Sequence, residues 1–443
     1  MCLALSSAAE PLWKAGVAKA DITPPNGLWM AGYATRTKPA EGKVMELWIK
    51  ALALEDAAGN RGVFLTSDTL GIPQTIYEHC LAALEKQYHL EARQVVLSAS
   101  HTHCGPVLRK SLMNAYPLDD HQRALLEQYA VTLESNIVQT IGRALADLKP
   151  ARLGAAEGEA GFAVNRRNNP ERLVPRLIAE GALKGPVDHA APVLAVYSTN
   201  NVLRALLFGY ACHNTVMAFY KWSGDYAGFA QIALEKSHPE AVAMFFNGCG
   251  GDQNPLPRGR LELAERYGNM LAAAVEETLR KPLRPVRPEL QTRMQMLDLD
   301  FGPAPTEAEL VALESGKQAS ARRWATNILA DIHAGVPLAR SFPYPVQAWK
   351  LGSQLLITLG GEPVVDYSLK FKKEFGQKTW IAGYCNDVMT YIPSLRVLRE
   401  GGYEGGKAMI PYGLPTWRWG DDVEDRITAT VEKLVASLPS EAK

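Results

Sequence analysis

Three short apolar runs, each ending in small polar residues, place the tightest limit on how this chain can fold. The runs cover residues 94–98, 203–212 and 242–246, and each has the pattern of a buried β-strand. Segments with a helical period lie between such runs, but strands and helices do not follow a strict βαβ repeat. We therefore expect an α/β fold in which helices cover a layered, mixed sheet.

The same periodicities predict the remaining elements. Helices are expected over 74–88, 119–148 and 260–279, with Asp119 or Asp120 as the N-cap of the second and Pro150 closing it. Further strands are expected at 13–17, 47–54, 62–66, 193–197, 346–350, 354–359 and 380–384. One helix should follow Glu362 and another should begin near residue 421. The proline-rich stretch 282–288 indicates a subdomain seam near 281–290.

Composition excludes several classes of function. The 443 residues include 47 Lys+Arg and 47 Asp+Glu, and no basic stripe stands out, so we expect no nucleic-acid partner. Glycine-rich nucleotide-binding motifs are absent from the sequence, and so is an apolar run long enough for a membrane span. A chain of this length buries a large core without a metal staple. Any metal site is therefore expected to be functional. Because the formal net charge is zero, we expect the substrate to be neutral or amphiphilic.

The N-terminus and the cysteines bear on the cellular compartment. Residues 1–10 are a short apolar stretch followed by small residues, which resembles the remnant of a signal peptide and favours a secreted or periplasmic protein. The alternative is a frayed cytoplasmic N-terminus. The six cysteines show no CxxC spacing, so a cysteine zinc site is not expected.

Two of the nine histidines, His101 and His103, follow the first apolar run directly, and His213 ends the second. Strand ends are where α/β enzymes usually place ligands and catalytic groups. The His-x-His pair can supply two metal ligands, or one ligand and one imidazole that faces the substrate. The bland alternative is a set of loop histidines bonded to backbone. Because histidines stand at the ends of two different strands, a zinc site shared between them is favoured over metal binding at either position alone.

Two further segments have the composition of a functional loop. Gly251, Asp252 and Asn254 lie in a glycine-rich loop after the third apolar run, where we expect them to bind substrate, although a tight turn would use the same residues. Glu362 ends a later strand. Its carboxylate fits either a metal ligand or an acid at a helix N-terminus.

Taken in order along the chain, several motifs resemble the neutral or alkaline non-lysosomal ceramidase superfamily. They are 15–24 with Gly32-Tyr33, 100–106, Asn165-Arg166, His213 with 223–225, Gly361-Glu362, and Tyr391 with 403–405. Each motif is weak by itself, but their collinearity is specific. The resemblance implies a layered mixed-sheet catalytic domain over 11–443, in a short, bacterial-type member that lacks the C-terminal immunoglobulin-like domain.

The resemblance also implies a site and a reaction. Zn²⁺ would be held by His101, His213, Glu362 and Tyr391. His103, Arg166 and Tyr403 would be catalytic groups that face the substrate. The implied reaction is hydrolysis of an N-acyl amide bond, in ceramide or a ceramide-like lipid, by a zinc-activated water.

The chain departs from the family pattern at one position. Asn254 stands where the family carries an active-site serine, and an amide cannot act as an alkoxide nucleophile. Hydrolysis by activated water survives this change, whereas a route through an acyl-serine does not. The alternatives are a zinc esterase or other acyl hydrolase on the same fold, and a metal-containing binding protein without turnover.

Overall fold

The computed structural model describes residues 12–25, 27–112 and 115–439. Its largest element is a nine-stranded mixed sheet. The strand order is β4 (Val95–Ala99), β3 (Arg61–Ser67), β2 (Trp48–Glu55), β1 (Trp13–Asp21), β5 (Lys149–Glu159), β7 (Ala190–Ser198), β8 (Leu203–Tyr210) and β9 (Val242–Asn247), with β11 (Arg284–Val286) paired to β5. The two outermost pairs, β3 with β4 and β8 with β9, are parallel, and the others are antiparallel.

A second sheet of four strands packs against one face of the first. Its order is β12 (Leu290–Asp300), β13 (Ser341–Leu351), β14 (Gln354–Leu359) and β16 (Trp380–Ala382). Apolar side chains from both sheets, including Phe64, Phe246, Trp349 and Leu356, form one buried core between them. The predicted layered, mixed-sheet α/β fold is confirmed.

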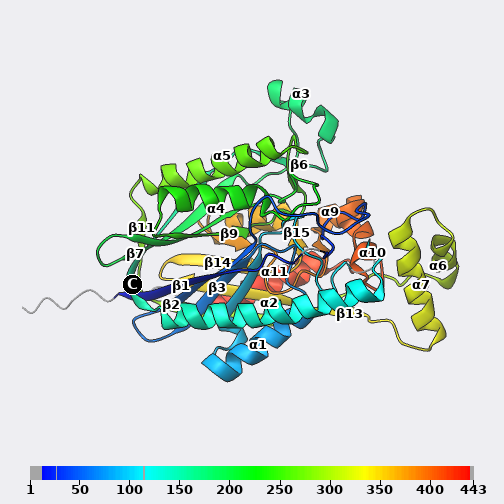
Figure 1. Ribbon diagram of the computed structural model, residues 1–443, viewed down its shortest axis with the longest axis horizontal. Helices are drawn as coiled ribbons and strands as arrows, with labels where there is room; N and C mark the ends of the chain where they lie inside the picture. Colours follow the sequence, from blue (N-terminus) through cyan, green and yellow to red (C-terminus); the bar gives the residue numbers. More distant parts are fainter. Residues whose placement is uncertain (1–11, 26, 113–114, 440–443) are drawn as a thin grey trace, which may run out of the picture.

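Helices cover the two outer faces. α1 (Gln74–Tyr88), α2 (Asp120–Ala146), α4 (Asp225–Ser237) and α5 (Leu261–Leu279) share a core with the free face of the larger sheet. α8 (Val365–Phe375), α9 (Leu395–Glu400) and α11 (Val423–Ala436) share a core with the smaller sheet. The layers are visible in Figure 1. In the described part of the chain, no helix combines the length and apolar character that a membrane span requires.

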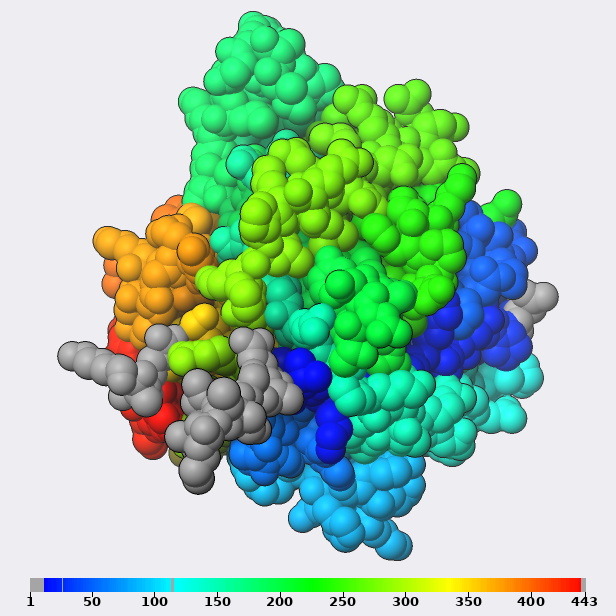
Figure 2. Space-filling model, turned by 90° about the vertical axis from the view of Figure 1, so that its left-hand side faces the viewer, coloured from blue at the N-terminus to red at the C-terminus, as the bar shows by residue number. Residues whose placement is uncertain are grey.

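Two excursions extend from these layers. α6 (Glu307–Glu314) and α7 (Ala319–His333) form a hairpin with a small core of its own, beside α10 (Met409–Tyr412) at the right of Figure 1. α3 (Val174–Ala179) projects at the top of Figure 1, and the same green projection stands out in Figure 2. The predicted signal remnant at 1–10 lies outside the described residues.

Most predicted elements occur within a few residues of their expected bounds, but the prediction that Pro150 closes the helix is wrong. α2 ends at Ala146, with Asp119 as its N-cap, and Pro150 lies inside β5, where it opposes Lys14. The apolar pattern of this helix continues past its last residue, because Leu145 and Leu148 both pack on the core. The stretch 282–288 holds β11 of the larger sheet, and β12 of the smaller sheet begins at Leu290.

Trp349 provides a test of the packing between the sheets. It is 1% exposed in the shared core, and its Nε1 donates to the carbonyl of Arg93 at 3.0 Å. We expect Trp349→Ala to lower the free energy of unfolding by about 3–5 kcal/mol, because a large cavity would open between the sheets. Denaturant unfolding measures this loss. Val131→Ala, at a position 54% exposed, should change stability by less than about 0.5 kcal/mol.

Candidate metal centre

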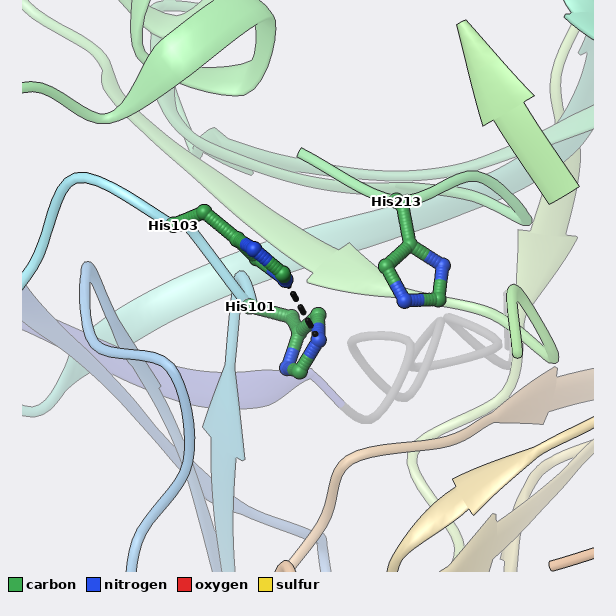
Figure 3. A group of neighbouring side chains, drawn as sticks. All are labelled: His101, His103 and His213. Carbon is green, nitrogen blue, oxygen red and sulfur yellow. Dashed lines mark hydrogen bonds between the residues drawn. The ribbon is translucent and has the colours of Figure 1, made fainter. Parts of the chain in front are cut away.

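The strand-end histidines are brought together by two crossing loops. His101 and His103 follow β4, His213 follows β8, and an isolated parallel bridge pairs Thr102 with Asn214. His101 has a φ of 62°, a left-handed conformation that is uncommon for a residue with a side chain. Such strain persists where the surroundings enforce it, which is often at functional sites. Figure 3 shows the three rings gathered around a common space.

Backbone carbonyls determine which nitrogen of two histidines faces this space. His101 Nδ1 donates to the Leu70 carbonyl at 2.6 Å, and His213 Nδ1 donates to the Gly250 carbonyl at 2.6 Å. With the proton on Nδ1, each neutral ring carries a lone pair on Nε2. This arrangement is characteristic of metal-binding imidazoles. Both Nε2 atoms lie 3.1 Å from Glu362 Oε2.

Glu362 and Tyr391 are neighbours because of a short parallel sheet. β15 (Glu362–Pro363) pairs with β17 (Tyr391–Ile392), and the two residues are direct partners in its register. The Tyr391 hydroxyl lies 3.0 Å from His213 Nε2 and accepts a hydrogen bond from Arg166 Nη2 at 3.1 Å. Burial raises the pKa of the Tyr391 phenol, an effect that Arg166 partly offsets.

The donor atoms fit a bound cation. Glu362 Oε2 is buried and has no hydrogen-bond donor among the described residues. Burial, together with the charge of Arg166, lowers the pKa of His213 to about 4, so its ring is neutral at pH 7. The Glu362 carboxylate oxygen and the Nε2 lone pair of His213 then face each other in a buried site, which is unfavourable unless a proton or a cation lies between them. Neutral imidazoles with a carboxylate are a donor set that zinc prefers.

His103 differs from the other two histidines. Its Nε2 lies 3.2 Å from His101 Nε2, and all three histidines fall within 4.8 Å of one another by their ligand atoms. Its buried Nδ1 has no partner within the described ranges. Packing also holds the ring: a Cβ on Gly32 would lie 2.4 Å from it. Because His101 carries its proton on Nδ1, the hydrogen bond between the two Nε2 atoms places a proton on His103 Nε2 and leaves its Nδ1 as a free acceptor.

Arg166 and Tyr403 lie beside Tyr391. The Arg166 guanidinium is 5.5 Å from the ring of Tyr391 and 6.0 Å from that of Tyr403. Arg166 Nη1 also donates to Asn254 Oδ1 at 3.2 Å. Tyr403 is 48% exposed, so its ring borders the solvent side of the site. The structure thus gathers the proposed ligands and the three proposed catalytic residues around one centre.

Gly251 and Asp252 lie behind the ligands. A Cβ on Gly251 would approach the carbonyl of Glu362 to 2.6 Å, so this glycine permits close packing of two backbones. Asp252 is buried, and its carboxylate accepts from the Val365 amide and from the Asn165 side chain, both at 2.9 Å. Among the described residues that line the cavity above the histidines, Gly251 and Asp252 do not occur, and neither does Asn254, so the predicted direct contact of this loop with substrate has no support from the cavity.

That cavity opens directly over the centre. It has a volume of about 790 Å³ and is lined at its base by His101, His103, Glu362 and Tyr391. Its walls are largely apolar or aromatic. They include Leu70, Leu112, Tyr116, Leu398, Ile410 and Trp417, with Leu313, Ser320 and Ala321 contributed by the α6–α7 hairpin.

Two contacts of the site were not predicted. Glu404 accepts from Arg166 Nε at 2.7 Å and also from Arg167, so it fixes both guanidinium groups. Its place beside Tyr403 in a recognised motif was an available signal. Tyr412 donates to Glu362 Oε1 at 2.5 Å. It lies in a segment without periodicity, 50 positions from its partner, and nothing in the sequence pointed to this pairing.

The fold and the site define a layered α/β protein with a buried candidate metal centre. The family model described as neutral/alkaline non-lysosomal ceramidase, N-terminal, matches residues 13–261, more than half of the chain. The chain therefore belongs to the neutral/alkaline non-lysosomal ceramidase family, which confirms the resemblance. The matched region includes His101, His103, Arg166 and His213. Glu362, Tyr391 and Tyr403 lie beyond it.

Curated relatives agree with this assignment. Neutral ceramidase of Pseudomonas aeruginosa is 28% identical over 245 residues, which cover 53% of this chain and 35% of the relative. Neutral ceramidase B of Dictyostelium discoideum is 26% identical over 278 residues, which cover 58% of this chain and 37% of the relative. The alignments thus span about a third of each relative's length.

Solved structures share the fold over nearly the whole chain. The structure named "Ceramidase complexed with C2" superposes with a TM-score of 0.71 at 21% identity, covering 98% of this chain and 77% of its own. Neutral ceramidase from Pseudomonas aeruginosa superposes with a TM-score of 0.70 at 22% identity, covering 98% of this chain and 76% of its own. At these identities the likeness establishes the fold alone.

The geometry predicts how zinc binding responds to mutation. His101→Ala and His213→Ala each remove one inward-facing Nε2, so each purified variant should retain much less zinc than the unmodified protein. Elemental analysis after dialysis measures the metal content. His333→Ala, on the exposed end of α7, is the matched control and should retain full zinc. Unchanged zinc content in both site variants would contradict the metal assignment.

Proposed function

We propose that this protein is a zinc-dependent hydrolase that cleaves the N-acyl amide bond of ceramide or a ceramide-like amphiphile. The observation that carries the proposal is the convergence of His101 Nε2, His213 Nε2 and Glu362 Oε2 at the base of a largely apolar cavity of about 790 Å³. Family membership supports an acyl-amide substrate. A cavity of this kind suits an apolar chain, because burial of its methylenes is favourable.

In this proposal, His101, His213 and Glu362 hold the metal, with Tyr391 as a fourth group. A bound zinc ion would act as a Lewis acid on the scissile carbonyl and supply a hydroxide nucleophile near neutral pH. Tyr391 is paired in register with Glu362 and lies 3.0 Å from His213 Nε2, which supports its inclusion.

The chain's own groups would handle protons and charge. His103 would take up and return a proton through Nδ1, which has no hydrogen-bond partner among the described residues. The Tyr403 hydroxyl, at the solvent side of the cavity, would donate to the oxygen on which negative charge develops. Arg166 faces both tyrosine rings, and its positive charge would favour the same charge build-up.

The loop that carries Asn254 would contribute positioning rather than a nucleophile. The Asn254 side chain is buried and accepts a hydrogen bond from Arg166, so it would act by holding that guanidinium in place. Gly251 and Asp252 would act indirectly, by packing the loop against Glu362 and Val365. Because no serine occupies position 254, water is the attacking group in this proposal.

Hydrolysis by the purified, zinc-loaded protein is the direct test. We expect release of fatty acid from N-acyl amides of the ceramide type, loss of that activity with a chelator, and recovery when zinc is restored. A parallel panel of esters with the same acyl chains separates an amidase from an esterase. Absence of turnover on both panels, in protein that holds zinc, would favour a binding protein and contradict the proposal.

The α6–α7 hairpin should limit the length of the apolar chain that the cavity accepts. Ala321 lines the cavity from the first turn of α7. We expect Ala321→Phe to fill space there and lower kcat/KM for long acyl chains by about tenfold or more, as the loss of a few methylene contacts would do. Two-carbon acyl substrates should change much less. Ala330→Phe, on the exposed face of the same helix, is the control and should leave the chain-length profile unaltered.

A further inference from the structure

The carboxylate of Glu362 is held at both oxygens, and only one of them faces the histidines. Oε2 lies 3.1 Å from each Nε2, whereas Oε1 accepts a hydrogen bond from the Tyr412 hydroxyl at 2.5 Å. We propose that Tyr412 is a positioning residue for the metal centre: its hydroxyl fixes the rotation of the Glu362 carboxylate so that Oε2 points at the metal position. This inference rests on the proposed metal-binding role of Glu362.

A glutamate needs such a restraint at this position. The terminal torsion of its side chain is broad, so the carboxylate plane is not set by rotamer preference alone. Glu362 is 1% exposed, which keeps water from satisfying Oε1. A buried carboxylate oxygen without a donor is unfavourable, because it has given up its hydration without replacement. Among the described residues, Tyr412 provides the hydrogen bond that Oε1 accepts, so it stabilises this orientation over a rotated one.

The chain directly after Tyr412 is held by hydrogen bonds. Tyr412 is the last residue of α10, which ends at Gly413 in a left-handed conformation with a φ of 82°, where the Gly413 amide donates to the Met409 carbonyl at 3.0 Å. The residue after Gly413 is Leu414, whose carbonyl accepts a hydrogen bond from the buried Nε1 of Trp324 at 2.7 Å. Trp324 belongs to the core of the α6–α7 hairpin. The Tyr412 hydroxyl therefore bonds Glu362 from a segment that other hydrogen bonds hold in place.

A different role can be distinguished by measurement. Tyr412 also lines the cavity, so its hydroxyl could instead serve the substrate. In that case its removal would raise KM and leave zinc affinity as it was. A positioning role predicts the reverse: weaker zinc binding in the absence of any substrate, and a fall in kcat at limiting zinc that excess zinc restores.

The test compares Tyr412→Phe with Tyr116→Phe, in the full chain, by competition for zinc against a chelator of known affinity. Both changes remove one hydroxyl at the same cavity, but the buried Tyr116 hydroxyl has no hydrogen-bond partner among the described residues. We expect Tyr412→Phe to weaken zinc affinity by about 10–100-fold, the usual effect of losing a group that orients a ligand. Tyr116→Phe should leave zinc affinity within about twofold of the unmodified protein, since no bond to a ligand is lost.

Melting of the zinc-free proteins completes the experiment. Tyr412→Phe leaves Glu362 Oε1 without its donor, so the zinc-free variant should melt somewhat below the unmodified zinc-free protein but keep a cooperative transition. Zinc affinity equal to that of the unmodified protein would overturn the inference while leaving the proposed function standing. Weak zinc binding by a zinc-free variant that has lost its cooperative unfolding transition would also overturn it, as the sign of a general structural role. If the unmodified protein binds no zinc, the proposed function fails together with the inference.

Discussion

Two hydrogen bonds to backbone carbonyls determine the character of this site. Because His101 and His213 donate from Nδ1 to Leu70 and Gly250, their Nε2 lone pairs are directed into one buried space. Glu362 Oε2 enters the same space, 3.1 Å from both nitrogens. Three electron-rich atoms this close in a buried site require a proton or a cation among them, and the low pKa of His213 favours the neutral ring, which is the form that binds a metal.

The fold brings these three atoms together. The bridge between Thr102 and Asn214 joins the loops after β4 and β8, and the pairing of Glu362 with Tyr391 supplies two further groups from the C-terminal third of the chain. The core between the two sheets holds the strands that carry these loops in register. A helical hairpin with its own core then completes the wall of the cavity above the histidines. Residues distant in sequence thus form one site through the ends of short strands.

Sequence patterns predicted those parts of the molecule that depend on local periodicity. α1 has its expected bounds, and the strand-end position of the histidines was visible because apolar runs stop directly before them. β5, with its glycines, alanines and proline, lacks a clear strand signal and was missed. The contact between Tyr412 and Glu362 was also missed, since tertiary packing alone brings them together. The family motifs supplied Tyr391 and Tyr403, which no periodicity distinguishes from packed tyrosines.

One metal ion should lie between Nε2 of His101, Nε2 of His213 and the carboxylate of Glu362. Anomalous diffraction at the zinc absorption edge, from crystals of the zinc-loaded protein, tests this placement most directly. We predict a single strong peak at about 2.0–2.2 Å from His101 Nε2, His213 Nε2 and an oxygen of Glu362. Zinc found only at surface sites, or bound through the Nδ1 atoms, with no peak between these three side chains, would contradict the account.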